Sequence, residues 1–125
     1  MKIYVASSWG NERYPEVVKA LKAVGHDVYD FRNTNPGGGG FNWEQIDPDW
    51  ESWSTEQYLE ALHHPLAAKA FQNDCNALAE ADAVVLVLPA GASAHTEFGY
   101  AVGAYKRTAI LLDPHSRPEL MYKLA

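Results

Sequence analysis

Short apolar runs alternate along this chain with stretches whose apolar residues recur at helical spacing. Four runs are typical of β-strands: residues 2–6, 26–31, 83–88 and 108–112. Helical spacing lies between them, at about residues 12–24, 66–79 and 94–105. Strands that alternate with helices predict parallel βαβ units with right-handed crossovers. We therefore expect a three-layer α/β fold, an open parallel sheet of about four strands in the order 2-1-3-4.

Other local patterns add detail to this plan. Residues 84–88 and 109–112 are almost wholly apolar, so both are expected to be central strands covered on each face. Ser54 and Gln57 fit a capping box that starts a helix ending near Pro65. The switch point of the sheet is expected between the first and third strands. The turn at residues 7–11 would then lie beside residues 89–97.

A long irregular segment, residues 32–53, interrupts the pattern within what we expect to be a single domain spanning 1–125. It holds four consecutive glycines and three tryptophans, Trp43, Trp50 and Trp53. Loops of this length inside a compact domain are usually functional or disordered. Two interpretations of the tryptophans stay open: they anchor the segment on the domain or a neighbouring subunit, or they cover a bound base. The glycines are not a P-loop, because no Gly-Lys-Ser or Gly-Lys-Thr follows them.

The composition of the chain indicates which partners, compartment and cofactors to expect. The chain has 10 basic and 16 acidic side chains, a formal charge of −6, which argues against a nucleic-acid polymer as partner. No stretch approaches the roughly 20 apolar residues that span a bilayer, so no membrane is expected. Residues 1–6 are interpreted as a strand and not a signal peptide, and Cys75 is the only cysteine. These features predict a cytoplasmic protein. The five histidines lack zinc spacing, and no metal or cofactor is expected.

The carboxylate of Glu97 is the first candidate for chemistry. It is expected in the first turns of a helix just beyond the C-terminal end of the strand at 83–88, where ligands bind in open α/β sheets. The positive end of the helix macrodipole favours an ionised carboxylate there. Gly99 and Gly103 suggest close backbone packing or a ligand nearby. The alternative is an ordinary solvated glutamate.

Asp74 is the second candidate, within a polar patch of the helix at 66–79. A pair of carboxyl groups suits glycosidic cleavage, whose transition state resembles an oxocarbenium ion and whose leaving group needs a proton. The alternative for Asp74 is a solvent-facing position. Tyr4 is expected in the core, whereas Trp9, in the turn after the first strand, is placed to stack on a planar ligand. Arg13 and Arg32 could hold a small anion.

Three segments together carry a resemblance to a known family. They are Ile3-Tyr4-Val5-Ala6-Ser7-Ser8-Trp9, Asn73-Asp74-Cys75-Asn76-Ala77-Leu78 and Glu97-Phe98-Gly99-Tyr100-Ala101. In this order they resemble the nucleoside 2-deoxyribosyltransferase superfamily, which also holds nucleoside 5′-monophosphate N-glycosidases. The sheet expected for this chain is flavodoxin- or Rossmann-like. A Ser-Ala-His-x-Glu signature, from Ser93 to Glu97, is similar to a phage and bacterial branch of that superfamily.

The resemblance implies a role for several residues. Glu97 would attack the anomeric carbon, Asp74 would handle the proton on the departing base, and Tyr4 would orient the glutamate. It also implies a homodimer or larger homo-oligomer. The residues expected to bind substrate are Ser7, Ser8, Trp9, Arg13, Arg32, Trp43, Ser93 and His95.

One position departs from the pattern of the superfamily. Six residues before the nucleophile, transferases commonly carry an aspartate that recognises the base, and nucleotide hydrolases a serine that binds phosphate. Here that position is Gly91, and the nearest serine is Ser93. Base and phosphate recognition therefore do not transfer from the family.

The expected function is cleavage or transfer at the N-glycosidic bond of a nucleoside or nucleoside 5′-monophosphate, through a covalent glycosyl-Glu97 intermediate. Water as acceptor gives a hydrolase, and a second base gives a transferase. A module that binds or senses nucleotides on the same fold, without chemistry, is the alternative.

Overall fold

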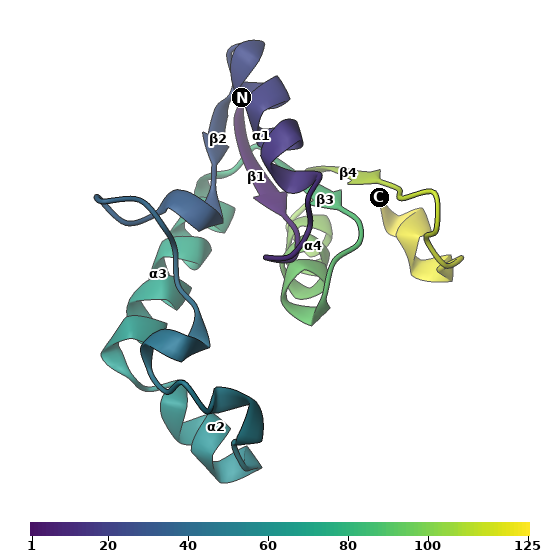
Figure 1. Ribbon diagram of the computed structural model, residues 1–125. Helices are drawn as coiled ribbons and strands as arrows, with labels where there is room; N and C mark the ends of the chain where they lie inside the picture. The colour runs from purple at the N-terminus through teal and green to yellow at the C-terminus, as the bar shows by residue number, and fades with distance from the viewer. The chain divides into compact units, whose positions relative to one another are not determined.

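The computed structural model describes all 125 residues, which divide into two compact units (Figure 1). We call residues 1–30 with 77–125 the sheet unit, and residues 31–76 the tryptophan unit. None of the helices combines the length and the apolar character needed to cross a membrane.

The sheet unit is built on four parallel strands. They are β1 (Lys2–Ala6), β2 (Asp27–Tyr29), β3 (Ala83–Val87) and β4 (Arg107–Leu111). The strand order is β2-β1-β3-β4, with every neighbouring pair parallel. This confirms the predicted α/β class and the order 2-1-3-4. It also confirms that β1 and β3, the pair on either side of the switch point, are neighbours.

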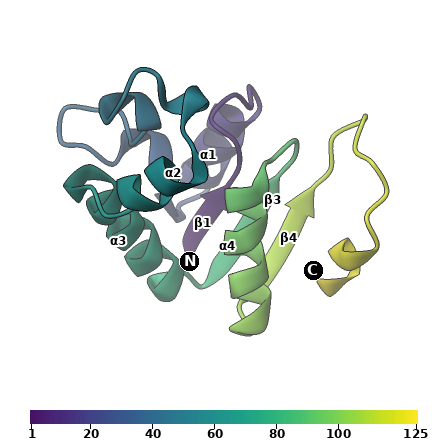
Figure 2. The same cartoon turned by 90° about the horizontal axis from the view of Figure 1, so that it is seen from below.

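Helices cover both faces of this sheet. Helix α1 (Tyr14–Ala23) and helix α4 (Ala92–Gly103) lie on opposite sides of it (Figure 2). On the α4 side a buried cluster joins strand and helix residues: Tyr4, Ala6, Val84, Leu86, Leu88, Ala94, Phe98 and Ala101, with Leu78 near the end of α3 and Ala81 just after it. Because side chains alternate across a strand, Ile3 and Val5 of β1 are buried on the other side, where α1 buries Tyr14 and Val18.

Strand β4 differs from the expectation for residues 109–112. It is the edge strand, and its residues alternate between exposed and half-buried. The chain leaves β4 for the 3-10 helix η4 (Leu120–Leu124), whose Tyr122 packs against the cluster on the α4 side. No helix follows β4 on the α1 side, so that face of the strand keeps its exposure. An apolar run by itself does not distinguish a central strand from such an edge.

The tryptophan unit has little regular structure before its helices. It holds three 3-10 helices, η1 (Phe31–Asn33), η2 (Trp43–Gln45) and η3 (Trp50–Ser52), then α2 (Thr55–Ala61) and most of α3 (Pro65–Glu80). The second strand is therefore shorter than predicted, because residue 31 already belongs to η1. The capping box of α2 is confirmed: Gln57 N–H donates to Ser54 Oγ at 3.2 Å, and Ser54 N–H donates to Gln57 Oε1 at 2.8 Å.

Aromatic edges hold the irregular segment to α2. The ring of Trp43 makes edge contacts with Phe41, Trp53 and Tyr58, with centroids 5.0, 5.6 and 6.3 Å away. Such edge-to-face pairs stabilise by more than their buried area alone. Trp43 and Trp53 therefore hold the irregular segment to α2 within the tryptophan unit. That the segment covers a bound base stays a prediction.

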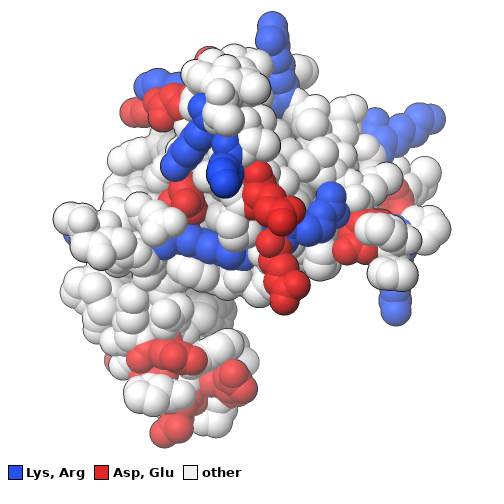
Figure 3. Space-filling view, turned by 45° about the horizontal axis from the view of Figure 1, so that its top comes forward, with Lys and Arg blue, Asp and Glu red and all other residues white.

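Charge is divided unevenly between the units. The tryptophan unit holds seven acidic and two basic residues, a net charge of −5, whereas the sheet unit holds nine acidic and eight basic residues, a net charge of −1. In Figure 3 the part of the surface around α2 shows acidic side chains without basic ones. The negative charge of the chain is therefore concentrated in its less regular part.

Candidate functional site

The loops that follow β1 and β3 meet at the switch point of the sheet. Both strands end at the same edge of the sheet, because they are parallel neighbours. The turn at residues 7–11 and the loop at 88–91 are joined by hydrogen bonds, as the sequence predicted. In open α/β sheets this edge is where ligands bind.

Asn11 is the central residue of this junction. Its side chain is 4% exposed, and Nδ2 donates to Ser7 Oγ at 2.9 Å and to the carbonyl oxygens of Val87 and Pro89, both at 3.1 Å. Its Oδ1 accepts the N–H of Arg13 at 2.8 Å. A single buried amide thus ties the β1 turn to the loop before α4.

Ser7 and Ser8, both half-buried, add two further ties between the same loops. The hydroxyl of Ser7 donates to the Val87 carbonyl at 2.9 Å, and Ser8 Oγ accepts the N–H of Gly91 at 2.8 Å. Gly91 is the N-cap residue of α4. The start of α4 is therefore fixed directly to the β1 turn.

Arg13 lies in the same part of the sheet unit. One guanidinium nitrogen, Nη1, donates to the carbonyl oxygen of Leu88 at 3.2 Å and to that of Leu112 at 3.0 Å. These bonds connect the loop after β3 with the end of β4. The sequence predicted that Arg13 holds an anion. In the structure its guanidinium binds two backbone carbonyl groups.

Helix α4 carries Glu97, but begins earlier than predicted. It starts at Ala92, so Glu97 is the sixth helical residue, in the second turn. The macrodipole acts mainly within the first turn, and its effect on this carboxylate is therefore small. Glu97 is half-buried and precedes Phe98, which is buried in the core cluster.

The two glycines of α4 do not pack against other parts of the chain. A Cβ added at Gly99 or Gly103 would meet nothing within 4 Å. The prediction of close backbone packing at these positions is therefore wrong within this chain. Both positions are exposed to solvent.

His95, one turn into α4, joins the helix to the C-terminal segment. Its Nδ1 lies 2.8 Å from the Gly91 carbonyl, and its Nε2 lies 2.7 Å from the Tyr122 hydroxyl. Since a carbonyl only accepts, Nδ1 carries a proton and donates to it. Burial, and then the charge of Glu119, raise the pKa of the Tyr122 phenol.

The remaining sheet-unit residues differ in exposure. Tyr4 is fully buried and stacks on Tyr29, with ring centroids 5.2 Å apart and planes at 16°. This confirms the core position expected for Tyr4. Trp9 is 47% exposed in the turn after β1, and Ser93 is exposed in the first turn of α4.

Three predicted site residues belong to the tryptophan unit. Asp74 is half-buried on α3, Arg32 is half-buried in η1, and Trp43 belongs to the aromatic group described above. The junction of the sheet unit brings together Ser7, Ser8 and Arg13. No group of three histidine, cysteine or acidic side chains has the arrangement of a metal site.

Asn11 is the residue that the sequence prediction missed. Its position two residues before Arg13 gives a local signal, since an asparagine side chain that accepts the N–H two residues on forms an Asx turn before a helix. The long-range bonds to Val87 and Pro89 have no such local signature.

No known family model matches this chain, and no curated protein sequence matches it either. The family resemblance therefore rests on the three segments of the sequence that carry it.

Proposed function

We propose that this protein cleaves or transfers at the N-glycosidic bond of a nucleoside or nucleoside 5′-monophosphate, with Glu97 as nucleophile. The observation that carries the proposal is the position of Glu97. It lies on the helix that begins at the switch point, and the start of that helix is fixed to the β1 turn. The three segments that resemble the nucleoside 2-deoxyribosyltransferase superfamily supply the reaction class.

The reaction has two steps with balanced bonds. A carboxylate oxygen of Glu97 forms a bond to C1′ of the sugar as the bond from C1′ to the base nitrogen breaks. The bonding electrons leave with the base, which takes up a proton. Water or a second base then attacks C1′ and gives up a proton to the Asp74 carboxylate, and the Glu97 carboxylate is released. Dividing the reaction in this way replaces one difficult step with two easier ones.

Other roles follow from the same resemblance. Asp74 supplies the proton to the departing base, Tyr4 orients the carboxylate of Glu97, and Trp9 stacks on the base. The exposed indole of Trp9 is compatible with this stacking. The resemblance further supports a homo-oligomer whose copies complete one another's sites.

The N-terminus of α4 is the feature we assign to the sugar or its 5′-phosphate. Free amide N–H groups in the first turn of a helix favour an anion, and Ser93 adds a hydroxyl there. Ser8 lies beside this turn through its bond to Gly91. Arg13 is assigned a supporting role only, because its guanidinium is bonded to two carbonyl groups.

The test is a panel of nucleosides and their monophosphates, incubated with and without a second free base and followed by chromatography. The intact protein should release or exchange base from at least one substrate. Glu97→Gln should reduce this turnover below detection, because the amide is a poor nucleophile. The matched control is Glu16→Gln, an exposed glutamate of α1 that should keep full activity.

A 2-fluoro-arabino nucleoside identifies the nucleophile separately. Its slow second step should leave a sugar adduct on Glu97, detected by mass spectrometry of peptides. An adduct on another residue, or normal turnover by Glu97→Gln, would overturn the assignment. Ligands that raise the melting temperature without any release of base would instead indicate a binding module.

A further inference from the structure

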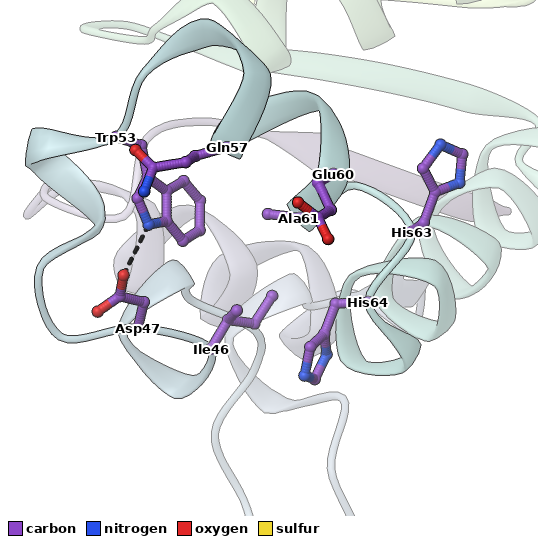
Figure 4. Close-up of a pocket in the computed structure, with 8 residues that line it drawn as sticks. All are labelled: Ile46, Asp47, Trp53, Gln57, Glu60, Ala61, His63 and His64. Atoms are coloured by element: carbon purple, nitrogen blue, oxygen red, sulfur yellow. Dashed lines mark hydrogen bonds between the residues drawn. The ribbon is translucent and has the colours of Figure 1, made fainter.

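The tryptophan unit contains a hollow that the proposed reaction does not use. Its volume is about 570 Å³, within the range of pockets that hold small molecules. Its lining includes Ile46, Asp47, Trp53, Gln57, Glu60 and His64 (Figure 4). All of these residues come from the segment around η2 and η3, from α2 and from the turn after it.

The hollow has a firmly held aromatic wall. The indole Nε1–H of Trp53 donates to Asp47 Oδ2 at 2.7 Å, a bond drawn in Figure 4. The other oxygen of Asp47 accepts the N–H of Asp49 at 2.9 Å. These two bonds, the backbone one first, hold the pKa of Asp47 below its usual value against the opposing effect of burial. An ionised carboxylate is therefore fixed at the edge of the indole.

No lysine or arginine lines the hollow beside its carboxylates. Between Arg32 and Lys69 the chain contains six acidic residues and no lysine or arginine. Asp47 and Glu60, two of the six, line the hollow. The Nδ1 atom of His64 accepts the N–H of Leu66 at 3.1 Å. The ring of His63 points away from the other lining side chains (Figure 4).

We propose that this hollow binds a small organic cation with an apolar body, such as a primary arylalkylamine. The ammonium group would lie at the carboxylate of Glu60, and the apolar body would pack on Trp53, Ile46 and Ala61. Asp47, on the other side of the indole, would add negative charge to the site (Figure 4). An indole attracts a cation to its face, and the apolar lining favours removal of the body from water. An anion would face two carboxylates with no lysine or arginine beside them.

Three probes of similar shape test the charge requirement. They are 2-phenylethylamine, which is a cation at neutral pH, 2-phenylethanol, which is neutral, and 3-phenylpropanoate, which is an anion. Each is titrated into ¹⁵N-labelled protein while the Trp53 indole N–H resonance is followed. The amine should shift this resonance with saturation, and the other two probes should not. An equal response to the alcohol would overturn the proposal.

Two matched variants locate the interaction on Glu60. Both Glu60→Gln and Glu56→Gln remove one exposed carboxylate from α2, but Glu56 does not line the hollow. Glu60→Gln should weaken binding of the amine about fivefold, the effect of losing one partly exposed charge pair. Glu56→Gln should leave binding unchanged. Equal weakening by both would show diffuse attraction by the acidic unit and overturn a defined site.

A third arm separates a small molecule from a protein side chain. An acetylated, amidated tripeptide with a central lysine carries the same ammonium group. Tighter binding of this peptide than of the amine would assign the hollow to a partner's lysine and overturn the small-molecule assignment. The site is independent of the proposed reaction, so Glu97→Gln should bind the amine normally and Glu60→Gln should keep N-glycosidic turnover.

Discussion

The sheet unit and the tryptophan unit maintain their structures by different interactions. In the sheet unit, backbone hydrogen bonds join the parallel strands, and aliphatic and aromatic side chains are buried between the sheet and its helices. Basic and acidic residues nearly balance there. In the tryptophan unit, three 3-10 helices are held by aromatic edges and by side-chain bonds to the backbone, and acidic residues predominate. The first arrangement suits the role proposed for Glu97, and the second supplies the acidic groups of the proposed cation site.

This contrast predicts different responses to local damage. Regions with few buried apolar contacts open at a lower free energy than core strands. Removal of a helix cap or a charge in the tryptophan unit should therefore destabilise only the residues nearby. Removal of a buried hydrogen bond at the switch point should destabilise the whole sheet unit. Three measurements test this difference, and the first has the largest expected effect.

Asn11→Ala should lower the free energy of unfolding by about 3 kcal/mol, because it leaves several buried backbone and hydroxyl groups without their partner. Urea unfolding followed by far-ultraviolet circular dichroism measures the change. The control is Asn42→Ala, an exposed asparagine before η2 whose side chain makes no capping bond; it should cost less than about 0.5 kcal/mol. Similar losses in the two variants would contradict a special role for the junction.

Ser54→Ala should destabilise α2 by about 1 kcal/mol, since it removes one half of the capping box. Amide hydrogen exchange should speed up in α2 and remain unchanged in β1 and β3. Thr55→Ala, at the next residue, leaves the cap intact and serves as the control. Equal acceleration of exchange in the strands would show that the two units open together and would contradict local opening of the tryptophan unit.

Acidification should release Trp53 from Asp47 with only a small effect on the sheet unit. The pKa of Asp47 in the folded protein lies below the usual 3.8, so its contribution to stability is present above that value and is lost as the pH falls through the lower folded value. The indole N–H resonance of Trp53 should titrate below 3.8. In Asp47→Asn this titration should be absent. A midpoint at or above 3.8 would contradict the hydrogen-bond assignment.

Much of the fold can be predicted from the pattern of apolar residues. The apolar runs locate β1 and β3 to within a residue, because both strands are buried between neighbours in the middle of the sheet. The same pattern overstates the burial of β4 and the length of β2. Whether a strand is covered depends on elements elsewhere in the chain, and the residues beyond Leu111 turn to only one face of the sheet.

The candidate site is less predictable because its contacts are distant in sequence. The prediction that the β1 turn meets the loop before α4 follows from topology alone, and it is confirmed. The role of Asn11 depends on carbonyl groups 76 and 78 residues away, which no local pattern indicates. Likewise, the early start of α4 follows from Gly91 as its N-cap, a position with no side-chain cap to reveal it. The catalytic roles of Glu97, Asp74 and Tyr4 stay predictions.

The position of β4 at the edge of the sheet has a consequence for self-association. The outer side of an edge strand presents backbone N–H and C=O groups that can pair with a strand of another molecule, and long apolar edges promote aggregation. Here the edge is only five residues long and begins with the charged side chain of Arg107, preceded by Lys106. At the opposite edge, β2 has three residues. Short strands at both edges, with charge at the start of β4, thus limit the template for strand addition.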